Sequence, residues 1–363
     1  MVANLLTQTR ATLTRLGALK PTTSLPSRLP GLESLPSLGD LPKGFAGTDW
    51  SEKIARLASL KPVAPLCGLT MPMGVQPTPL VPEGATFDEH VHHGASGTIS
   101  YRLYVPSHMP NAPMPLVVML HGCTQSPEDF AAGTRMNELA EAEGFLVAYP
   151  RQTQRANAQK CWNWFDAKDQ QRDHGEPALI AGLTREIIAT HPVDAGRVYV
   201  AGLSAGGAAA AIMAQRYPDL YAAAGVHSGL AAGAATDMPG AFAAMRGGGR
   251  SAPGRSVPTI VFHGDADRTV HPSNGDQVLN QSRGGTGLAT AETRGSSDGG
   301  MAFTKHVEAD AKGRPMLEHW RLHGAGHAWS GGSAAGTYTE PRGPDASREM
   351  LRFFLAHRLD AGA

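Results

Sequence analysis

The stretch that decides the fold is Gly202-Leu203-Ser204-Ala205-Gly206. It follows the apolar run 197–201 and precedes the small-residue run 207–213, which predicts a strand, a tight turn and a helix in succession. Glycines flank the serine because such a turn strains the serine backbone and brings strand and helix too close together for larger side chains. This is the setting of a nucleophile elbow, and Ser204 is the expected nucleophile.

A G-x-S-x-G pentapeptide also occurs by chance in a chain with 43 glycines, so the partners of Ser204 decide its interpretation. A serine hydroxyl becomes nucleophilic when a histidine takes its proton, and a buried carboxylate holds that histidine in the correct tautomer. The β-rich run 258–262 leads into the segment His263-Gly264-Asp265-Ala266-Asp267-Arg268-Thr269-Val270. The pattern H-G-x-x-D-x-x-V, common after a late strand in α/β-hydrolases, favours Asp267 as the acid, with Asp265 capping the turn.

The expected base is His327, in a Gly-rich segment that follows the strand expected at 318–322. The chain has 15 histidines, and most of them are expected at the surface or in hydrogen-bonded core positions. His327 follows the acid and lies on a loop just beyond a strand end, where catalytic groups are commonly carried. No metal site is expected at His90-Val91-His92-His93, because no third-ligand pattern such as H-E-x-x-H accompanies it; an exposed entry loop is expected there.

Acyl transfer also needs N–H donors for the negative charge that develops on the carbonyl oxygen. The apolar run 115–120 predicts a buried strand of a parallel sheet, and it leads into His121-Gly122-Cys123-Thr124-Gln125. The amides of Cys123 and Ala205 are the expected donors of an oxyanion hole. The same segment is also typical of a strand-to-helix turn, since Ser126-Pro127 favours a helix start, and both interpretations hold together.

Together these residues resemble the esterases of the polyhydroxybutyrate depolymerase type, which are related to feruloyl and acetylxylan esterases. The resemblance covers roughly residues 86–359 and includes the motifs Cys161-Trp162-Asn163-Trp164-Phe165 and Gly175-Glu176-Pro177. It implies an α/β-hydrolase fold, with a mostly parallel central sheet and helices on both faces. It also implies that Ser204, Asp267 and His327 form a catalytic triad that hydrolyses carboxylic esters through an acyl-enzyme, with no metal or other cofactor.

The resemblance implies poly- or oligo-3-hydroxybutyrate as the substrate, so a polyester polymer or granule is an expected partner. The alternative is a feruloyl or acetylxylan esterase or a general short-chain carboxylesterase, and a non-catalytic granule-binding protein is the remaining interpretation. Gln125 is expected to touch the ester. Trp162, Trp164 and Trp329 are expected to flank an acyl or polyester chain, the alternative being that they serve as core or rim packing.

Residues 1–85 form a Pro-rich extension to the catalytic domain expected at 86–359. Leucines recur at helical spacing within residues 1–20, which predicts an amphipathic helix, and a second short helix is expected at 50–60. Polar residues interrupt the first segment too early for a secretory signal, and no stretch reaches the apolar length of a membrane span. The extension is either a solvated tail or an anchor on a hydrophobic polymer surface.

The three cysteines are Cys67, Cys123 and Cys161. An odd number without a signal peptide indicates a cytoplasmic or granule-associated protein, with secretion by another route left open. Cys123 and Cys161 both fall within motifs of the proposed site. A disulfide between them would join the oxyanion loop to the Cys161 segment, while two small buried thiols are the alternative.

Composition and charge agree with one large α/β domain that acts on neutral substrates. The 363 residues are 41% hydrophobic, and the 32 basic and 32 acidic residues give a formal net charge of zero. Without a long basic run, nucleic acid is not an expected partner, and the oligomeric state is left open. Strands and helices alternate, with helices expected at 127–143 and 176–191 and surface loops at 246–250 and 283–300.

Overall fold

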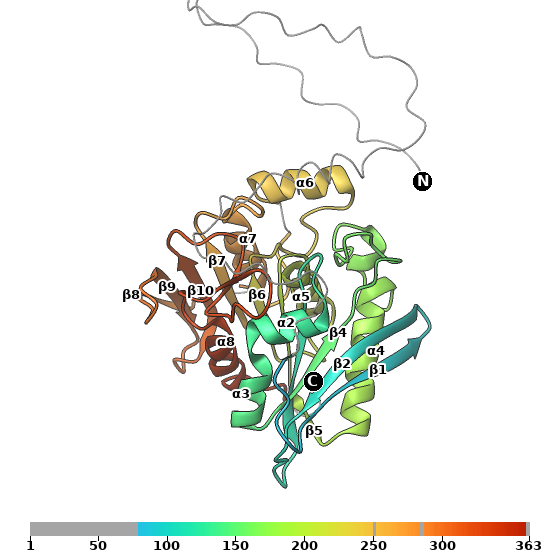
Figure 1. The fold of residues 1–363 in the computed structure, drawn as a ribbon. Helices are drawn as coiled ribbons and strands as arrows, with labels where there is room; N and C mark the ends of the chain where they lie inside the picture. Colours follow the sequence, from blue (N-terminus) through green and yellow to red (C-terminus); the bar gives the residue numbers. More distant parts are fainter. Residues whose placement is uncertain (1–78, 250–251, 284–286, 361–363) are drawn as a thin grey trace, which may run out of the picture. The chain divides into compact units, whose positions relative to one another are not determined.

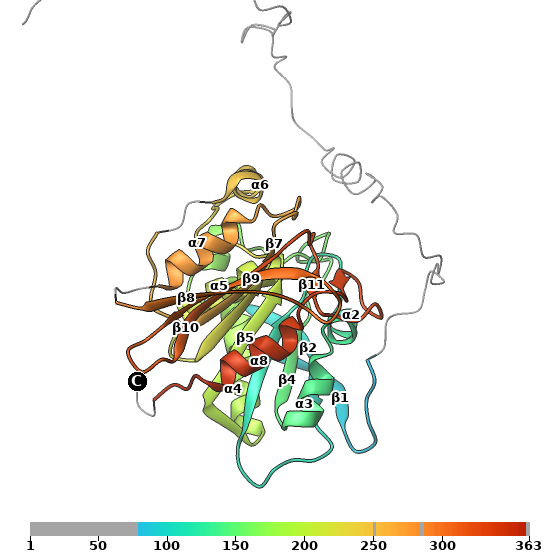
Figure 2. The same cartoon turned by 90° about the vertical axis from the view of Figure 1, so that its left-hand side faces the viewer.

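The computed structural model describes residues 79–249, 252–283 and 287–360 (Figure 1). The two helices expected at 1–20 and 50–60, and Cys67, lie outside the described residues. The described part is built around one large twisted sheet with helices on both faces, as Figure 2 shows from a second direction. This agrees with the predicted architecture.

The sheet has ten strands in the order β1-β2-β4-β3-β5-β6-β7-β10-β9-β8. The six strands from β4 to β10 in that order run parallel, and antiparallel strands extend each edge. The strands are β1 (Thr86–Gly94), β2 (Gly97–Val105), β3 (Met114–Leu120), β4 (Leu146–Pro150), β5 (Val193–Leu203), β6 (Ala223–His227), β7 (Thr259–Gly264), β8 (Ala289–Ser296), β9 (Ala302–Ala309) and β10 (Pro315–Leu322). A small separate sheet pairs β11 (Trp329–Ser330) with β12 (Thr339–Glu340).

Helices cover both faces of the sheet because the parallel strands are apolar on both sides. One face packs against α4 (Gly175–Thr190), α5 (Ala205–Arg216) and α7 (Ser273–Ser282). The other packs against α2 (Pro127–Thr134), α3 (Met136–Glu143) and α8 (Ala346–Leu355). Among the described residues, the remaining helices are the 3₁₀ turn η1 (Ala167–Gln170) and α6 (Met238–Gly247). The hydrophobic core is thus split by the sheet, as in a three-layer domain.

Three local expectations differ from the structure. The helix expected at 127–143 is interrupted at Arg135. This residue adopts a left-handed φ of +57° and lies between the end of α2 and the start of α3. The segment expected as an entry loop at His90-Val91-His92-His93 lies within the edge strand β1, where each residue pairs with β2. The loop expected at 283–300 contains β8, an exposed strand that pairs with β9 through its backbone.

Candidate active site

The residues of the candidate site come from loops at the edge of the sheet where the parallel strands have their carboxyl ends. Parallel strands place their carboxyl ends at the same edge, which is where ligands of open α/β sheets bind. The segment 121–125 follows β3, Ser204 follows β5, Asp267 follows β7 and His327 follows β10. Sheet topology therefore brings together four segments that are far apart in the sequence.

The elbow has the geometry that its sequence predicts. Ser204 lies between β5 and α5 with φ +58° and ψ −120°, a region that non-glycine residues rarely occupy. A Cβ on Gly202 would overlap the carbonyl of Gly206, and a Cβ on Gly206 would overlap the carbonyl of Leu120. Both flanking positions therefore require glycine, because strand, turn and helix touch backbone to backbone.

The expected acid and base are in direct contact. His327 Nδ1 lies 2.7 Å from Asp267 Oδ2, and the Asp267 side chain has no exposed surface. A carboxylate only accepts, so Nδ1 carries the proton and the lone pair of Nε2 is left to take a proton from a hydroxyl. Asp265, the alternative acid, is paired elsewhere: its carboxylate contacts His323 Nδ1 at 2.8 Å and the Gly324 amide at 2.7 Å.

Asp267 is held by more donors than His327 alone. Its Oδ1 accepts the amides of Thr269 at 2.8 Å and Val270 at 2.9 Å, and His263 Nε2 lies 3.5 Å from Oδ2. Burial by itself would raise the pKa of Asp267, but the nearby His263 ring and the hydrogen bond from His327 outweigh it and hold that pKa well below its ordinary value. The carboxylate is therefore ionised throughout the neutral range.

His227 connects the elbow to the loop of His327, a link that the sequence analysis missed. The Ser204 hydroxyl makes no hydrogen bond to His327 within the described segments, and such bonds are often long before substrate binds. The carbonyl oxygen of His227 accepts the Ser204 amide at 2.9 Å. The imidazole Nε2 of His227 accepts a hydrogen bond from the Ser330 amide at 3.0 Å. Burial lowers the pKa of His227 to about 3, so this nitrogen stays unprotonated and can accept. No sequence pattern marks this role, since His227 ends an ordinary buried strand.

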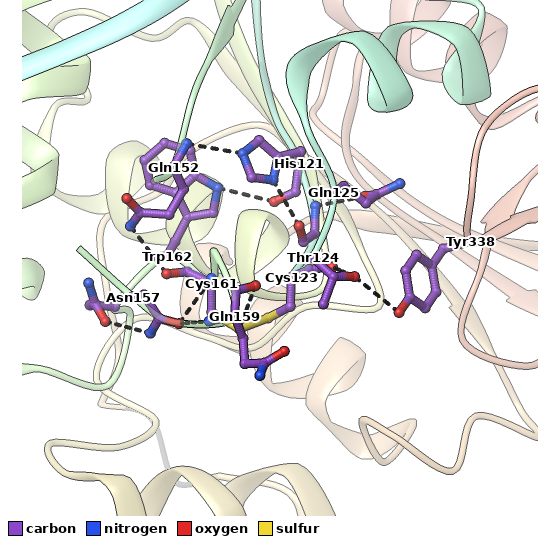
Figure 3. The surroundings of a disulfide bond; sticks show 12 residues. His121, Cys123, Thr124, Gln125, Gln152, Asn157, Gln159, Cys161, Trp162 and Tyr338 are labelled. Atoms are coloured by element: carbon purple, nitrogen blue, oxygen red, sulfur yellow. Dashed lines mark hydrogen bonds between the residues drawn. A yellow bond between two sulfur atoms is a disulfide. The ribbon is translucent and has the colours of Figure 1, made fainter. Parts of the chain in front are cut away.

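The segment expected to supply an oxyanion donor is fixed from several sides (Figure 3). Cys123 and Cys161 are joined by a disulfide. The Thr124 amide donates to the Gln159 carbonyl at 2.6 Å, and the Trp162 indole donates to the His121 carbonyl at 3.1 Å. Of the hydrogen bonds between described residues, none uses the amide of Cys123 or of Ala205 as donor. Their assignment as the donors of an oxyanion hole stays a prediction.

Gln125, expected to touch the ester, is instead buried and joins two loops. Its Oε1 accepts the Gly122 amide at 2.9 Å, while Nε2 donates to Asp129 Oδ2 and to the Thr337 carbonyl, each at 3.0 Å. Asp129 also accepts the Thr337 amide at 2.8 Å. Gln125 thus joins the segment 121–125, which is expected to supply an oxyanion donor and is called the oxyanion segment below, to the loop around Thr337.

The three tryptophans expected to flank the substrate are buried. Trp162 and Trp329 are 0% and 1% exposed, and Trp164 is 6% exposed. The Trp162 indole supports the His121 carbonyl, and the Trp329 indole donates to Ser347 Oγ at 3.1 Å while its ring stacks on His227. In this structure they support the loops of the site and offer no open face to a bound chain, which is the packing alternative.

The carboxylate of Glu176, a partly buried residue, holds the Cys161 segment in place. Glu176 accepts the amide and the side-chain amide of Asn163 at 2.8 and 2.6 Å, and that of Gln152 at 2.5 Å. Gln152 in turn donates its backbone amide to His121 Nε2 at 3.1 Å. Burial and the nearby charge of Asp169 raise the pKa of Glu176 to about 7. The Gly175-Glu176-Pro177 motif is thereby connected to the oxyanion segment.

The histidines on β1 make separate contacts. His92 Nδ1 contacts Glu186 at 2.5 Å, His93 Nδ1 contacts Thr98 Oγ1 at 3.2 Å, and His90 stacks on Tyr101. In the described part of the chain, no group of three or more His, Cys, Asp or Glu side chains is placed to hold a metal ion. Within the same residues, no helix has the length and apolarity needed to cross a membrane.

Comparison with known proteins identifies the family. A family model described as "Esterase PHB depolymerase" matches residues 99–299, more than half of the 363 residues. The chain belongs to this esterase family. The matched region includes Ser204 and Asp267 and ends before His327.

The relatives of this chain include a polyester depolymerase and a feruloyl esterase. Poly(3-hydroxyalkanoate) depolymerase C of Paucimonas lemoignei is 35% identical over 246 residues, covering 64% of this chain and 58% of the depolymerase. Feruloyl esterase B of Neurospora crassa is 30% identical over 221 residues, covering 54% of this chain and 74% of that protein. The match thus spans little more than half of the depolymerase.

A solved structure establishes the fold. Acetyl xylan esterase from Aspergillus awamori superimposes with a TM-score of 0.58 at 20% sequence identity, covering 74% of this chain and 99% of that one. At this identity the likeness bears on the fold alone. The α/β-hydrolase fold implied by the family resemblance is confirmed.

Proposed function

We propose that this protein is a serine esterase that hydrolyses carboxylic esters through an acyl-enzyme at Ser204. The observation that carries the proposal is the 2.7 Å contact between His327 Nδ1 and the buried Asp267 carboxylate, at the same sheet edge as a strained elbow serine. A histidine oriented in this way has Nε2 available as the general base, and the elbow geometry belongs to nucleophilic serines.

The proposed reaction has two halves, acylation of Ser204 and hydrolysis of the acyl-enzyme, and His327 acts in both. His327 Nε2 takes the Ser204 proton as Oγ attacks the ester carbonyl carbon, and the amides of Cys123 and Ala205 stabilise the negative oxygen of the tetrahedral intermediate. Collapse breaks the bond to the alcohol oxygen, which receives the proton from His327. A water molecule, deprotonated by His327, then attacks the acyl carbon. The bond from that carbon to Ser204 Oγ breaks, Oγ receives the proton back from His327, and the acid is released.

Poly- or oligo-(3-hydroxyalkanoate) is the proposed substrate class, because the depolymerase relative is named for that polyester and is 35% identical over 246 residues. Feruloyl or acetylated carbohydrate esters are the second candidates, which the feruloyl esterase relative favours. The neutral overall charge of the chain is compatible with either group of uncharged esters. A granule-binding protein without catalysis would need no ionised Asp267 paired to His327.

The compartment expected from the cysteine count is revised in this proposal. A disulfide between Cys123 and Cys161 persists in oxidising compartments and is rare in the cytoplasm. The bridge therefore favours a location outside the reducing cytoplasm over the cytoplasmic or granule-associated location. Measuring free thiols in protein isolated under alkylating conditions from the native cell would decide between the two.

Covalent labelling combined with turnover tests the proposed function. A fluorophosphonate should label Ser204, and Ser204→Ala should lose both the label and hydrolysis, by about 10⁶ in kcat. Hydroxybutyrate oligomers, feruloyl esters, acetylated xylan and p-nitrophenyl esters form the substrate panel. A label mapped to another serine would contradict the assignment. Absence of label and turnover in the wild type would favour the granule-binding interpretation.

A further inference from the structure

Tyr338 is the exposed aromatic residue beside the oxyanion segment. Its side chain belongs to the few large apolar or aromatic groups that the described residues leave open, at 47% exposure. Its φ is +52°, a conformation that costs a bulky side chain energy and is found where the surrounding structure enforces it. Such strain tends to persist at ligand-contacting positions.

The backbone around Tyr338 is held on both sides by buried groups. The Tyr338 carbonyl accepts the Trp329 amide at 2.7 Å, and the preceding Thr337 is bound to Asp129 and Gln125. These contacts come from two separate segments of the site. Tyr338 is therefore positioned before any ligand arrives, and little conformational entropy remains for a ligand to remove.

The hydroxyl group fixes the direction of the ring. Thr124 Oγ1 lies 2.6 Å from the Cys123 carbonyl, which only accepts, so the Thr124 proton is committed there. In the 3.2 Å contact between Thr124 Oγ1 and the Tyr338 hydroxyl, Tyr338 is consequently the donor. Figure 3 shows the Tyr338 hydroxyl directed at Thr124, which lies next to Cys123. The ring thus stands beside Thr124 with its hydroxyl proton occupied, in a residue that is 47% exposed.

The loop that carries Tyr338 has no charged side chain between residues 331 and 339. Residues 331–339 contain only glycine, serine, alanine, threonine and this tyrosine. With its hydroxyl engaged by Thr124, the ring offers apolar area and no charge to a neighbouring group. The ligand chemistry that fits is an uncharged, apolar group.

We propose that Tyr338 is a specificity-determining residue whose ring forms an apolar wall for the group carried beside the reacting ester carbonyl. This inference rests on the proposed esterase function. The Thr124 contact holds the wall against the oxyanion segment. Esters with an extended apolar group next to the carbonyl gain contact with the ring, and an acetyl group is too short to do so. Tyr338 takes no part in proton transfer or covalent chemistry.

The test compares substrates of graded size on five proteins: wild type, Tyr338→Phe, Tyr338→Ala, Tyr338→Gly and Leu355→Ala. Leu355, on α8, is 46% exposed and serves as the matched control. One substrate series varies the acyl chain of p-nitrophenyl esters from acetate to octanoate, and the other varies the alcohol of acetate esters. The series that responds shows whether the wall faces the acyl group or the alcohol.

Tyr338→Ala should lower kcat/KM for the longer members of one series about tenfold more than for p-nitrophenyl acetate, through KM and with kcat little changed. Tyr338→Phe keeps the ring but loses the Thr124 contact that directs it, so the same series should lose less than it does with Tyr338→Ala and more than with Leu355→Ala. Tyr338→Gly, which removes ring and backbone strain together, should repeat the Ala selectivity without a lower melting temperature. Equal loss on all esters, or unchanged selectivity in an active Tyr338→Ala protein, would overturn the inference. A wild type inactive on every ester would overturn the proposed function itself.

Discussion

At the scale of single residues, the two acids of the turn after β7 have distinct surroundings. Asp267 is buried and accepts a hydrogen bond from His327, whereas Asp265 lies at the surface beside His323. Asp267→Asn should reduce kcat by about 10⁴, because the amide can donate to Nδ1 and stabilise the wrong tautomer of His327. Steady-state kinetics on a soluble p-nitrophenyl ester measure the effect.

Asp265→Asn is the matched control for that substitution, since it makes the same change two residues away. Its kcat should stay within a few-fold of wild type. His327→Ala should lose activity as Ser204→Ala does. If Asp265→Asn were the more damaging change, the role of acid would pass to Asp265 and the structure of the turn would need another explanation.

The nucleophile, acid and base of the proposed triad could be predicted from sequence because each follows a strand within a short, recognisable turn. The role of Gln125 could not, because its partner Thr337 lies 212 residues away and the contact depends on two loops meeting in space. No sequence pattern predicts the position of Tyr338 either, because its contact with Thr124 also joins two loops that are far apart in the sequence. It lies in a segment of small residues with no periodicity, and its importance is visible only from its φ angle and its contact with Thr124.

At the scale of secondary-structure elements, predictions succeeded where apolar periodicity was strong. The break at Arg135 was missed because no glycine or asparagine marks this left-handed residue and the polar pattern continues through it. Strand β8 was missed because nearly all of its residues are exposed, so no alternation of apolar and polar residues marks it. Its order comes from backbone pairing with β9, which the sequence of β8 does not encode.

The N-terminal turn of α4 carries a pH-dependent contribution to stability through Glu176. Its pKa rises from 4.5 to about 7 in the folded protein, mainly because of burial. A raised folded pKa means that the native state binds more protons between these values. This contribution is therefore fully present below about pH 4.5 and is lost as pH rises through about 7.

Relative to Glu176→Gln, the wild type should lose unfolding free energy over this interval, by at most about 1.4 kcal/mol per pH unit. Urea unfolding of both proteins at intervals of half a pH unit, with the disulfide intact, measures the difference. Taking the difference removes the opposing effect of buried histidines such as His121, whose pKa burial lowers to about 4. Glu143→Gln, the same substitution at an exposed position on α3, is the control. A difference between the wild type and the Glu176→Gln variant that is flat with pH would contradict this account.

At the scale of the whole molecule, every part of the candidate site belongs to one body of packed residues. The core clusters on the two faces of the sheet draw on residues from 99 to 354, and the four loops of the site leave strands of that same sheet. The disulfide and the Gln125 contacts join these loops to one another directly. Catalytic geometry should therefore depend on residues 79–360 alone.

Deleting residues 1–78 tests this independence. Hydrolysis of a soluble short-chain p-nitrophenyl ester should stay within a few-fold of the full chain, because the Pro-rich composition of the extension leaves only short apolar pieces with which to build a core of its own. Adsorption to an insoluble polyester film, measured on the same two proteins, separates the two roles left open for the extension. If its leucines anchor the protein on polymer, the deletion weakens adsorption, since each buried methylene contributes about 0.8 kcal/mol. If the extension is a passive tail, adsorption is unchanged. Equal loss of activity on soluble ester and on polymer would contradict the prediction and make the extension a structural part of the catalytic domain.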